Sequence, residues 1–177
     1  MSKFKLIKSD ILFKGKVFDL KVDEIEYDST GNTGRREVAI HPGGAVVVAV
    51  TNENKIIMVR QFRYPFQEWI LELPAGKLDN NEEPQLCAER ELTEETGYSA
   101  GKISKLGHIY TTPGFCNEIL HIFLAENLTA GEHAREEGEE GMEIFEFTID
   151  EIKQKIASGE IVDAKTISGI MMYLNKS

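Results

Sequence analysis

The chain has 177 residues, of which 41% are hydrophobic and 28% are charged, a composition typical of a soluble globular protein. This length is enough for one hydrophobic core and too short for two domains of ordinary size. Its formal net charge of −10 at pH 7 argues against binding to nucleic acid or to an anionic membrane surface. The sequence has no apolar run of about 18 residues and no signal-peptide pattern at its start, so we expect a cytoplasmic protein.

The two cysteines agree with that expectation. Cys87 and Cys116 show neither a disulfide framework nor a paired metal-ligand spacing, and free thiols suit a reducing compartment. A cysteine nucleophile served by His108 or His121 is an alternative chemistry, but the sequence gives neither thiol a visible activating partner.

The first 41 residues are predicted to form a β-hairpin region. Residues 16–28 alternate loosely, with Phe18, Leu20 and Val22 on one side, and a turn cluster at residues 29–34 leads into a second strand at 35–41. The simplest role expected for this hairpin is to form the edge of a sheet.

Two core strands are predicted next, at residues 45–50 and 56–60, because the first is a short apolar run rich in β-branched residues and a polar turn separates them. A further strand at 69–73 runs into Pro74. The Gly43-Gly44 pair is followed by neither a helix nor a lysine, which argues against a phosphate-binding glycine loop.

A short helix is predicted at residues 85–96, after Pro84 and before Gly97. Within it, Glu91 and Glu95 are four residues apart and therefore lie one above the other, with Glu94 on the neighbouring row. Like charges at this spacing destabilise an isolated helix. A hard cation such as Mg²⁺, which takes one or two carboxylates together with water and substrate phosphate, would explain the arrangement, although a solvated acidic face is the plainer reading.

Neighbouring residues of this helix also have expected partners. Arg90 is placed to pair with Glu94, or to reach back to Glu82. Ala88 and Leu92 form an apolar row that is expected to face a core.

Strands are predicted at residues 105–112 and 119–125, around a loop that contains Pro113 and Gly114. The stretch 127–146 is the most densely charged part of the chain and is predicted to be a solvated loop.

Two helices are predicted to end the chain. Thr148 and Glu151 form a capping box at the start of the first. The second covers residues 163–174, with Asp163 as its N-cap. Its predicted core stripe consists of Ile167, Ile170, Met171 and Leu174.

The acidic helix and its entry loop resemble the signature box of the Nudix hydrolases. The family pattern is glycine, five residues, glutamate, seven residues and then REUxEExGU, where U is aliphatic; here it begins at Gly76, includes Glu82 and continues from Arg90 to Gly97. The final aliphatic position is occupied by Tyr98, which is also apolar. The resemblance implies an α/β (α+β) Nudix fold with mixed sheets sandwiched between helices, in a domain at 42–177, and Mg²⁺-dependent hydrolysis of a nucleoside diphosphate linked to another moiety, with Mn²⁺ as the alternative metal.

The strings RQFRYP and LELPAGKLD are similar to those of the ADP-ribose pyrophosphatase branch of that family. This resemblance implies that Arg63 contacts the phosphate or ribose of the substrate and that Glu72 helps to place the nucleotide. The carbonyl group of Ala75 would join Glu91 and Glu95 as a metal ligand. Glu94 would serve as a further metal or catalytic carboxylate, and Arg90 would belong to the catalytic set.

An acidic protein binds a pyrophosphate only where metals or arginines reverse the local charge. Arg35 and Arg36 are therefore further substrate-binding candidates, beside Arg60 and Arg63. A surface salt bridge is the plainer role for any single arginine.

Two more features follow from the resemblance. Pro113 stands 15 positions beyond Tyr98, an offset that accompanies ADP-ribose specificity in the family, and Pro113, Gly114 and Glu118 would border the terminal ribose. A glutamate of the acidic stretch would act as the catalytic base, with Glu140 as the first candidate and Glu139 as the second. Without the resemblance, Pro-Gly is a common turn signal.

The sequence therefore predicts an enzyme that hydrolyses ADP-ribose to AMP and ribose 5-phosphate. A broader nucleotide-sugar pyrophosphatase, acting for example on GDP-mannose, is one alternative, and a non-catalytic nucleotide sensor is another. By resemblance, the N-terminal hairpin would pack across a homodimer.

Overall fold

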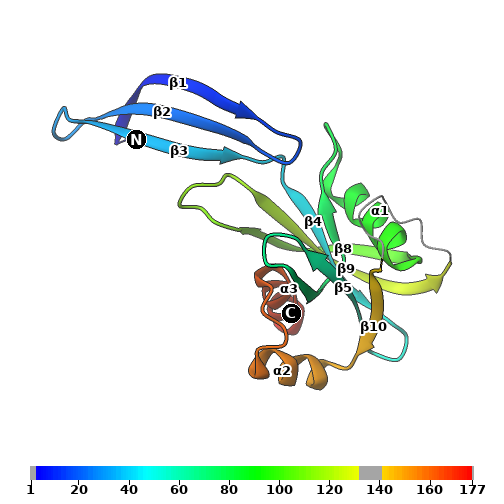
Figure 1. The fold of residues 1–177 in the computed structure, drawn as a ribbon. Coiled ribbons are helices and arrows are strands. Elements are labelled where there is room, and N and C mark those ends of the chain that lie inside the picture. The colour runs from blue at the N-terminus through cyan, green and yellow to red at the C-terminus, as the bar shows by residue number, and fades with distance from the viewer. Residues whose placement is uncertain (1–2, 132–140, 177) are drawn as a thin grey trace. The chain divides into compact units, whose positions relative to one another are not determined.

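The computed structural model describes residues 3–131 and 141–176 (Figure 1). The chain divides into two compact units. The first comprises Met1–Gly43 and Tyr110–Ile119, and the second comprises Gly44–Ile109 and Leu120–Ser177.

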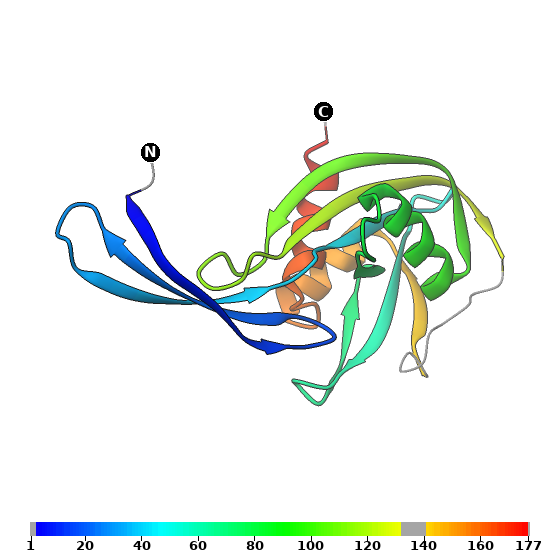
Figure 2. The ribbon, with the colours of Figure 1, turned by 90° about the horizontal axis from the view of Figure 1, so that it is seen from above.

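The first unit contains an antiparallel sheet of three strands in the order β1-β2-β3, with bounds β1 (Phe4–Lys14), β2 (Asp19–Tyr27) and β3 (Thr33–Ile40) (Figure 2). The predicted hairpin corresponds to β2 and β3. Strand β1 was not predicted, because every one of its residues is exposed and two register shifts break its pairing with β2. An exposed edge strand of this kind lacks the alternating pattern by which a half-buried strand is recognised.

The loop at residues 111–118 is held to the end of β3 by backbone hydrogen bonds. The N–H of Ala39 donates to the carbonyl of Phe115 at 2.8 Å, and the N–H of Asn117 donates to the carbonyl of Ala39 at 3.2 Å. The Asn117 side chain also accepts from the N–H of His41 at 2.7 Å. The ring of His41 lies 3.2 Å from Glu118.

The second unit is built on a seven-stranded mixed sheet. Five strands follow the order β10-β5-β4-β9-β8, while β6 pairs with β5 and β7 pairs with β4. The strand bounds are β4 (Gly44–Val50), β5 (Ile56–Arg63), β6 (Glu68–Glu72), β7 (Ala75–Lys77), β8 (Tyr98–Tyr110), β9 (Ile119–Ala130) and β10 (Glu143–Phe147).

Helices cover both faces of this sheet (Figure 1), and they are α1 (Pro84–Thr96), α2 (Ile149–Ser158) and α3 (Ala164–Leu174). Strand β4 is buried along its whole length. Val46 and Val48 belong to the cluster that contains Ile170 of α3, whereas Ala45 and Val47 belong to the cluster of α1. Successive side chains of β4 point to opposite faces of the sheet and therefore pack into two different cores. This arrangement confirms the predicted fold of strands sandwiched between helices.

Two predictions in this unit were wrong. The stretch 127–146 is not simply a loop, because β9 extends to Ala130 and β10 begins at Glu143. On α3, Met171 and Leu174 are exposed, whereas Met172 and Tyr173 pack against the core. The buried stripe includes Gly169, whose missing Cβ atom would lie 2.7 Å from Leu73. The close approach of Gly169 to Leu73 therefore determines which face of α3 is buried. The positions of the large apolar residues in the sequence do not show which face this is.

The N-termini of α2 and α3 are capped as the sequence predicts. Thr148 and Glu151 form the predicted capping box of α2, and Asp163 caps α3 by accepting from the N–H of Thr166 at 2.9 Å. None of the helices in the described ranges is both long and apolar enough to cross a membrane.

Candidate active site

Helix α1 presents its carboxylates from a fixed position. Pro84 starts its first turn, and Gly97 ends it in the left-handed conformation, with φ of 75° and its N–H donating to the carbonyl of Thr93 at 2.8 Å. As predicted, Ala88 and Leu92 are buried against the sheet, together with Cys87. Burial of a leucine side chain stabilises a fold by roughly 1.5–3 kcal/mol, so this apolar row fixes the rotation of the helix and hence the direction of its acidic row.

Glu91 lies directly over Gly76. A Cβ atom on Gly76 would stand 1.8 Å from Oε1 of Glu91 and 1.9 Å from its Cδ, closer than any pair of non-bonded atoms. The glycine at the start of the signature box is therefore required by the carboxylate that packs on it, and Glu91 is only 7% exposed.

Replacement of Gly76 by alanine is expected to displace the Glu91 carboxylate. Because Glu91 is predicted to bind the metal, the apparent affinity for Mg²⁺, measured by titrating the metal in an activity assay, should fall by at least about tenfold, the size of effect typical when the support of a metal ligand is changed. Gly107→Ala is the matched control, because its Cβ would meet only the flexible Met172 side chain, at 3.3 Å. An unchanged Mg²⁺ dependence in Gly76→Ala would contradict this role of Glu91.

Glu95 is the second buried carboxylate of the helix, with 2% of its surface exposed. Its Oε2 accepts a hydrogen bond from the N–H of Ala75 at 3.0 Å. This bond joins the helix to the strand segment whose carbonyl group was predicted to bind metal. Glu91, Glu95 and Ala75 are thus brought together in one place.

Arg90 is surrounded by carboxylates. Its Nε donates to Glu82 at 3.0 Å, and its Nη1 donates to Glu91 at 2.7 Å and to Glu94 at 2.9 Å. Arg90 therefore pairs with both predicted partners, Glu82 and Glu94, at the same time. The hydrogen bond to Glu82 is the foremost cause of a raised pKa at Arg90, and the same bond lowers the pKa of Glu82. Arg90 thus balances the repulsion that the spacing of the glutamates would otherwise create.

The donor set suits a hard divalent cation. Two buried carboxylates and a nearby backbone carbonyl match the oxygen ligands that Mg²⁺ takes, usually one or two carboxylates with water and substrate phosphate. Within the described ranges, no three side chains of His, Cys, Asp or Glu are grouped to hold a metal by themselves.

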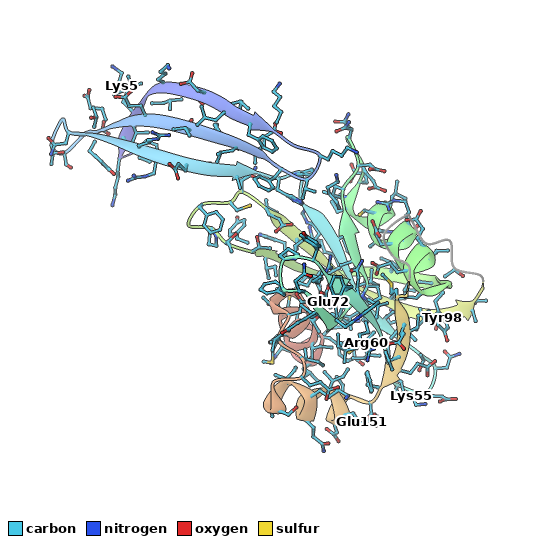
Figure 3. All side chains as sticks on the ribbon, viewed as in Figure 1. Lys5, Lys55, Arg60, Glu72, Tyr98 and Glu151 are labelled. Carbon is cyan, nitrogen blue, oxygen red and sulfur yellow. The ribbon has the colours of Figure 1, made fainter. Side chains whose placement is uncertain are left out.

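A second charged group in this unit involves Arg63 and Glu72, both predicted to bind substrate. Arg63 donates to Glu72 through Nε at 2.8 Å and through Nη2 at 2.6 Å, and Lys165 of α3 makes a further hydrogen bond to the same carboxylate. Figure 3 labels Glu72 among the side chains of the second unit. Burial by itself would raise the pKa of Glu72, but Arg63 and Lys165 outweigh it and lower the pKa. A lowered folded pKa means that this network stabilises the fold at neutral pH and loses that effect as the pH falls below the ordinary value of 4.5.

Arg60, a further candidate, lies in β5 of the second unit and pairs with Glu143 at 2.9 Å. The other predicted substrate residues that the structure describes belong to the first unit. Arg36 stacks over Tyr27, with 5.6 Å from its Cζ to the ring centroid, and donates to the carbonyl of Arg35 at 2.7 Å. Arg35 lies 3.8 Å from Glu37. The exposed Pro113 and Gly114 lie in the loop that is held to β3, and Glu118 follows in the same loop. The two base candidates, Glu140 and Glu139, lie outside the described residues.

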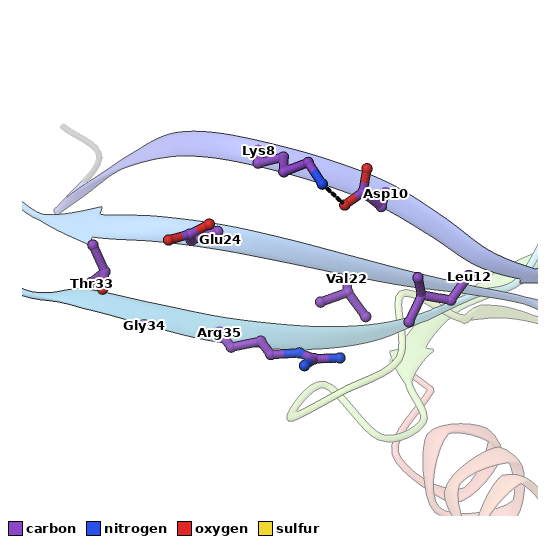
Figure 4. A pocket seen from close by; sticks show the side chains of 8 residues that line it. All are labelled: Lys8, Asp10, Leu12, Val22, Glu24, Thr33, Gly34 and Arg35. Atoms are coloured by element: carbon purple, nitrogen blue, oxygen red, sulfur yellow. Dashed lines mark ion pairs between the residues drawn. The ribbon is translucent and has the colours of Figure 1, made fainter.

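A cavity of about 430 Å³ lies on the sheet of the first unit (Figure 4). Lys8 and Asp10 on its wall form an ion pair at 2.6 Å. Val22 and Leu12 add apolar surface, and Arg35 adds a cation. Both signs of charge thus line the cavity, together with apolar side chains.

The alternative of a cysteine nucleophile is not supported by the chemistry of Cys87. Burial raises the pKa of its thiol to about 12, with further contributions from the charges of Glu82 and Glu91. The thiolate, which is the nucleophilic form, is therefore suppressed at neutral pH. Cys87 serves instead as a packing residue of α1.

Lys165 is the site residue that the sequence reasoning missed. It follows the N-cap of α3 and belongs to no motif, so its pairing with Glu72, 93 positions earlier, has no local signal. The only related signal in the sequence was the predicted N-cap at Asp163, which placed Lys165 in the first turn of a helix.

Comparisons with known proteins give a consistent result. The NUDIX domain model matches residues 41–168. The ADP-ribose pyrophosphatase of Bacillus subtilis (strain 168) is 47% identical over 94% of this chain and 90% of its own length. The methanol dehydrogenase activator of Bacillus methanolicus is 42% identical over the same shares. The crystal structure of an ADP compounds hydrolase has a TM-score of 0.86 at 17% identity, covering 98% of this chain and 94% of that one, which shows a shared fold.

Proposed function

The chain belongs to the Nudix hydrolase family, and on that premise we propose that it hydrolyses the pyrophosphate of ADP-ribose to AMP and ribose 5-phosphate with Mg²⁺. The observation that carries the proposal is the pair of buried carboxylates, Glu91 and Glu95, which meet Gly76 and Ala75 at the start of the box. Mn²⁺ is the alternative metal.

The residues of the second unit have separate tasks in this proposal. Glu91, Glu95 and the Ala75 carbonyl would hold the metal, with Glu94 as a further carboxylate, and Arg90 keeps the row of glutamates compatible with a folded helix. When bound, Mg²⁺ supplies neutralisation of the diphosphate charge and activation of a water molecule.

Substrate contact and proton transfer fall to other residues. Arg63 would donate to a phosphate or ribose oxygen, because a guanidinium matches the geometry of such anions, and Glu72 would help to place the nucleotide. Glu140, or Glu139 as the second candidate, would accept the proton of the attacking water.

The choice of ADP-ribose rests on similarity to the pyrophosphatase of Bacillus subtilis and on the strings RQFRYP and LELPAGKLD, with Pro113 at the expected offset. In this proposal Pro113, Gly114 and Glu118 border the terminal ribose, and Arg35 and Arg36 contribute positive charge. GDP-mannose is the principal competing substrate. A non-catalytic sensor is disfavoured because binding alone does not require Arg90, Glu91, Glu94 and Glu95 together.

The test is product analysis with the purified full chain. ADP-ribose and Mg²⁺ are expected to give AMP and ribose 5-phosphate in equal amounts, and chelation with EDTA should stop the reaction. Tight binding of ADP-ribose in the presence of Mg²⁺ without release of AMP would overturn the enzymatic assignment and favour a sensor. In that case, the relative named as a methanol dehydrogenase activator would become the more informative comparison.

The proposed organisation is a cytoplasmic homodimer in which residues 1–41 form the dimerisation element and residues 42–177 form the hydrolase domain. Leu6, Leu12 and Phe13 of β1 are each more than half exposed, and Phe4, Ile7 and Ile11 of the same strand are also exposed. Exposed apolar surface concentrated in one element is typical of a protein interface, and a second copy of this chain is the proposed partner. Sedimentation equilibrium should give a dimer for the wild type and a monomer for a Leu12→Glu, Phe13→Glu variant; a monomeric wild type would contradict the dimer.

A further inference from the structure

The buried carboxylate of Glu72 has two cationic partners. Its side chain is only 3% exposed, yet it receives two hydrogen bonds from Arg63 and one from Lys165. A buried carboxylate needs a partner, since an uncompensated buried charge is strongly destabilising. One cation would meet that need, so the second requires an explanation.

The two cations differ in how firmly they are held. The Lys165 side chain is 13% exposed, and its Nζ also lies 3.1 Å from Oδ2 of Asp163. Asp163 is in turn fixed as the N-cap of α3, where it accepts from the N–H of Thr166. The Arg63 side chain is 37% exposed. Lys165 is thus the anchored partner, and Arg63 is the one with access to solvent and to a ligand.

The same helix end is bonded to the strand that carries Glu72. The N–H of Leu73 donates to Oγ1 of Thr166 at 2.8 Å, and this hydroxyl donates to Asp163 at 2.6 Å. The backbone next to Glu72 is therefore fixed to α3. Movement of Arg63 away from Glu72 would leave the Lys165 contact in place.

The charge balance favours such a movement. Arg63 and Lys165 carry two positive charges, and Glu72 and Asp163 carry two negative ones. If Arg63 turns its guanidinium to an anionic pyrophosphate, Lys165 still compensates Glu72. Without Lys165, the same movement would leave a buried carboxylate with no cation, and Arg63 would be retained by Glu72.

We propose that Lys165 is a positioning residue that acts as the internal counter-ion of Glu72 and so releases Arg63 to bind the pyrophosphate of the substrate. This inference rests on the proposed function. It assigns the C-terminal helix a part in substrate binding, although Lys165 itself does not touch the substrate.

The test compares steady-state kinetics for ADP-ribose in five proteins: wild type, Lys165→Met, Lys165→Arg, Glu72→Gln, and Lys165→Met in the Glu72→Gln background. Lys165→Met is expected to raise KM at least tenfold with kcat within about threefold, and Lys165→Arg should restore KM to within about threefold. In the Glu72→Gln background, the added Lys165→Met change should alter KM less than about threefold, because the uncharged amide that replaces the carboxylate needs no counter-ion. A wild-type KM in Lys165→Met, or an undiminished effect in the Glu72→Gln background, would overturn the proposal.

A control separates this role from a general loss of positive charge. Lys153→Met on α2 removes an equal charge from an exposed side chain and should leave KM unchanged. If Lys165→Met fails to fold by circular dichroism, Lys165→Arg and the double variant still decide the question. Calorimetric titration with ADP-ribose in EDTA gives the same comparison for variants too slow to assay.

The outcomes for the two proposals are distinct. A wild type that cleaves ADP-ribose while Lys165→Met behaves identically overturns only the role of Lys165. A wild type that cleaves none of the nucleotide sugars overturns the proposed function, and the calorimetric comparison then tests whether Lys165 governs nucleotide binding.

Discussion

Replacement of Glu95 by glutamine is expected to lower kcat for ADP-ribose hydrolysis by at least about 100-fold while leaving the fold intact. Changes to groups that merely support a metal ligand cost roughly 10- to 100-fold in other proteins, so loss of a ligand charge should cost at least the upper end of that range. The fold should survive because a glutamine oxygen can still accept from the N–H of Ala75, as Glu95 does at 3.0 Å. Steady-state assays over a range of Mg²⁺ concentrations measure the effect.

Glu89→Gln is the matched control for this experiment. Glu89 lies on the same helix and is exposed, where it accepts from Gln85 at 3.0 Å. The control removes the same charge from α1 and should keep activity close to that of the wild type. Near-normal turnover in Glu95→Gln would exclude Glu95 from the metal site.

Replacement of Arg90 by methionine is expected to reduce both stability and activity. Methionine fills much of the space but leaves Glu82, Glu91 and Glu94 without the cation that they share. Removing one partner of a buried ion pair costs about 3–5 kcal/mol, and since Arg90 is 27% exposed we expect about 2 kcal/mol, or about 4–8 °C in Tm for a chain of this size. Turnover should fall by at least about 100-fold because Glu91 loses its positioning contact.

Thermal unfolding with and without Mg²⁺ tests this prediction. Mg²⁺ should raise the Tm of Arg90→Met more than that of the wild type, because a bound cation would relieve the same repulsion. Arg90→Lys keeps the charge but not the forked geometry and should fall between the two. Equal metal-free Tm values for Arg90→Met and the wild type would contradict the balancing role of Arg90.

The sequence predicted most of the second unit because its determinants are local. The apolar run at residues 45–50 indicated a strand buried on both faces, and the spacing of Ala88 and Leu92 indicated which side of the helix meets the core. The spacing of the box also predicted two of the three carboxylate partners of Arg90, namely Glu82 and Glu94. Each of these features depends on residues within about ten positions of one another.

Features that depend on distant residues were not predicted. Strand β1 is exposed throughout and has no pattern of its own. The buried face of α3 is set by how closely Gly169 approaches Leu73, and the ion pair of Lys165 with Glu72 joins segments 93 positions apart. Tertiary packing decides all three, and a linear pattern of residue types does not record it.

The most direct test of the central claim is a comparison of kcat/KM for ADP-ribose and GDP-mannose at matched concentrations with Mg²⁺. The proposed function predicts a value at least tenfold higher for ADP-ribose, equivalent to about 1.4 kcal/mol of preference in the transition state. A flat profile or a preference for GDP-mannose would contradict the assignment of ADP-ribose as the substrate.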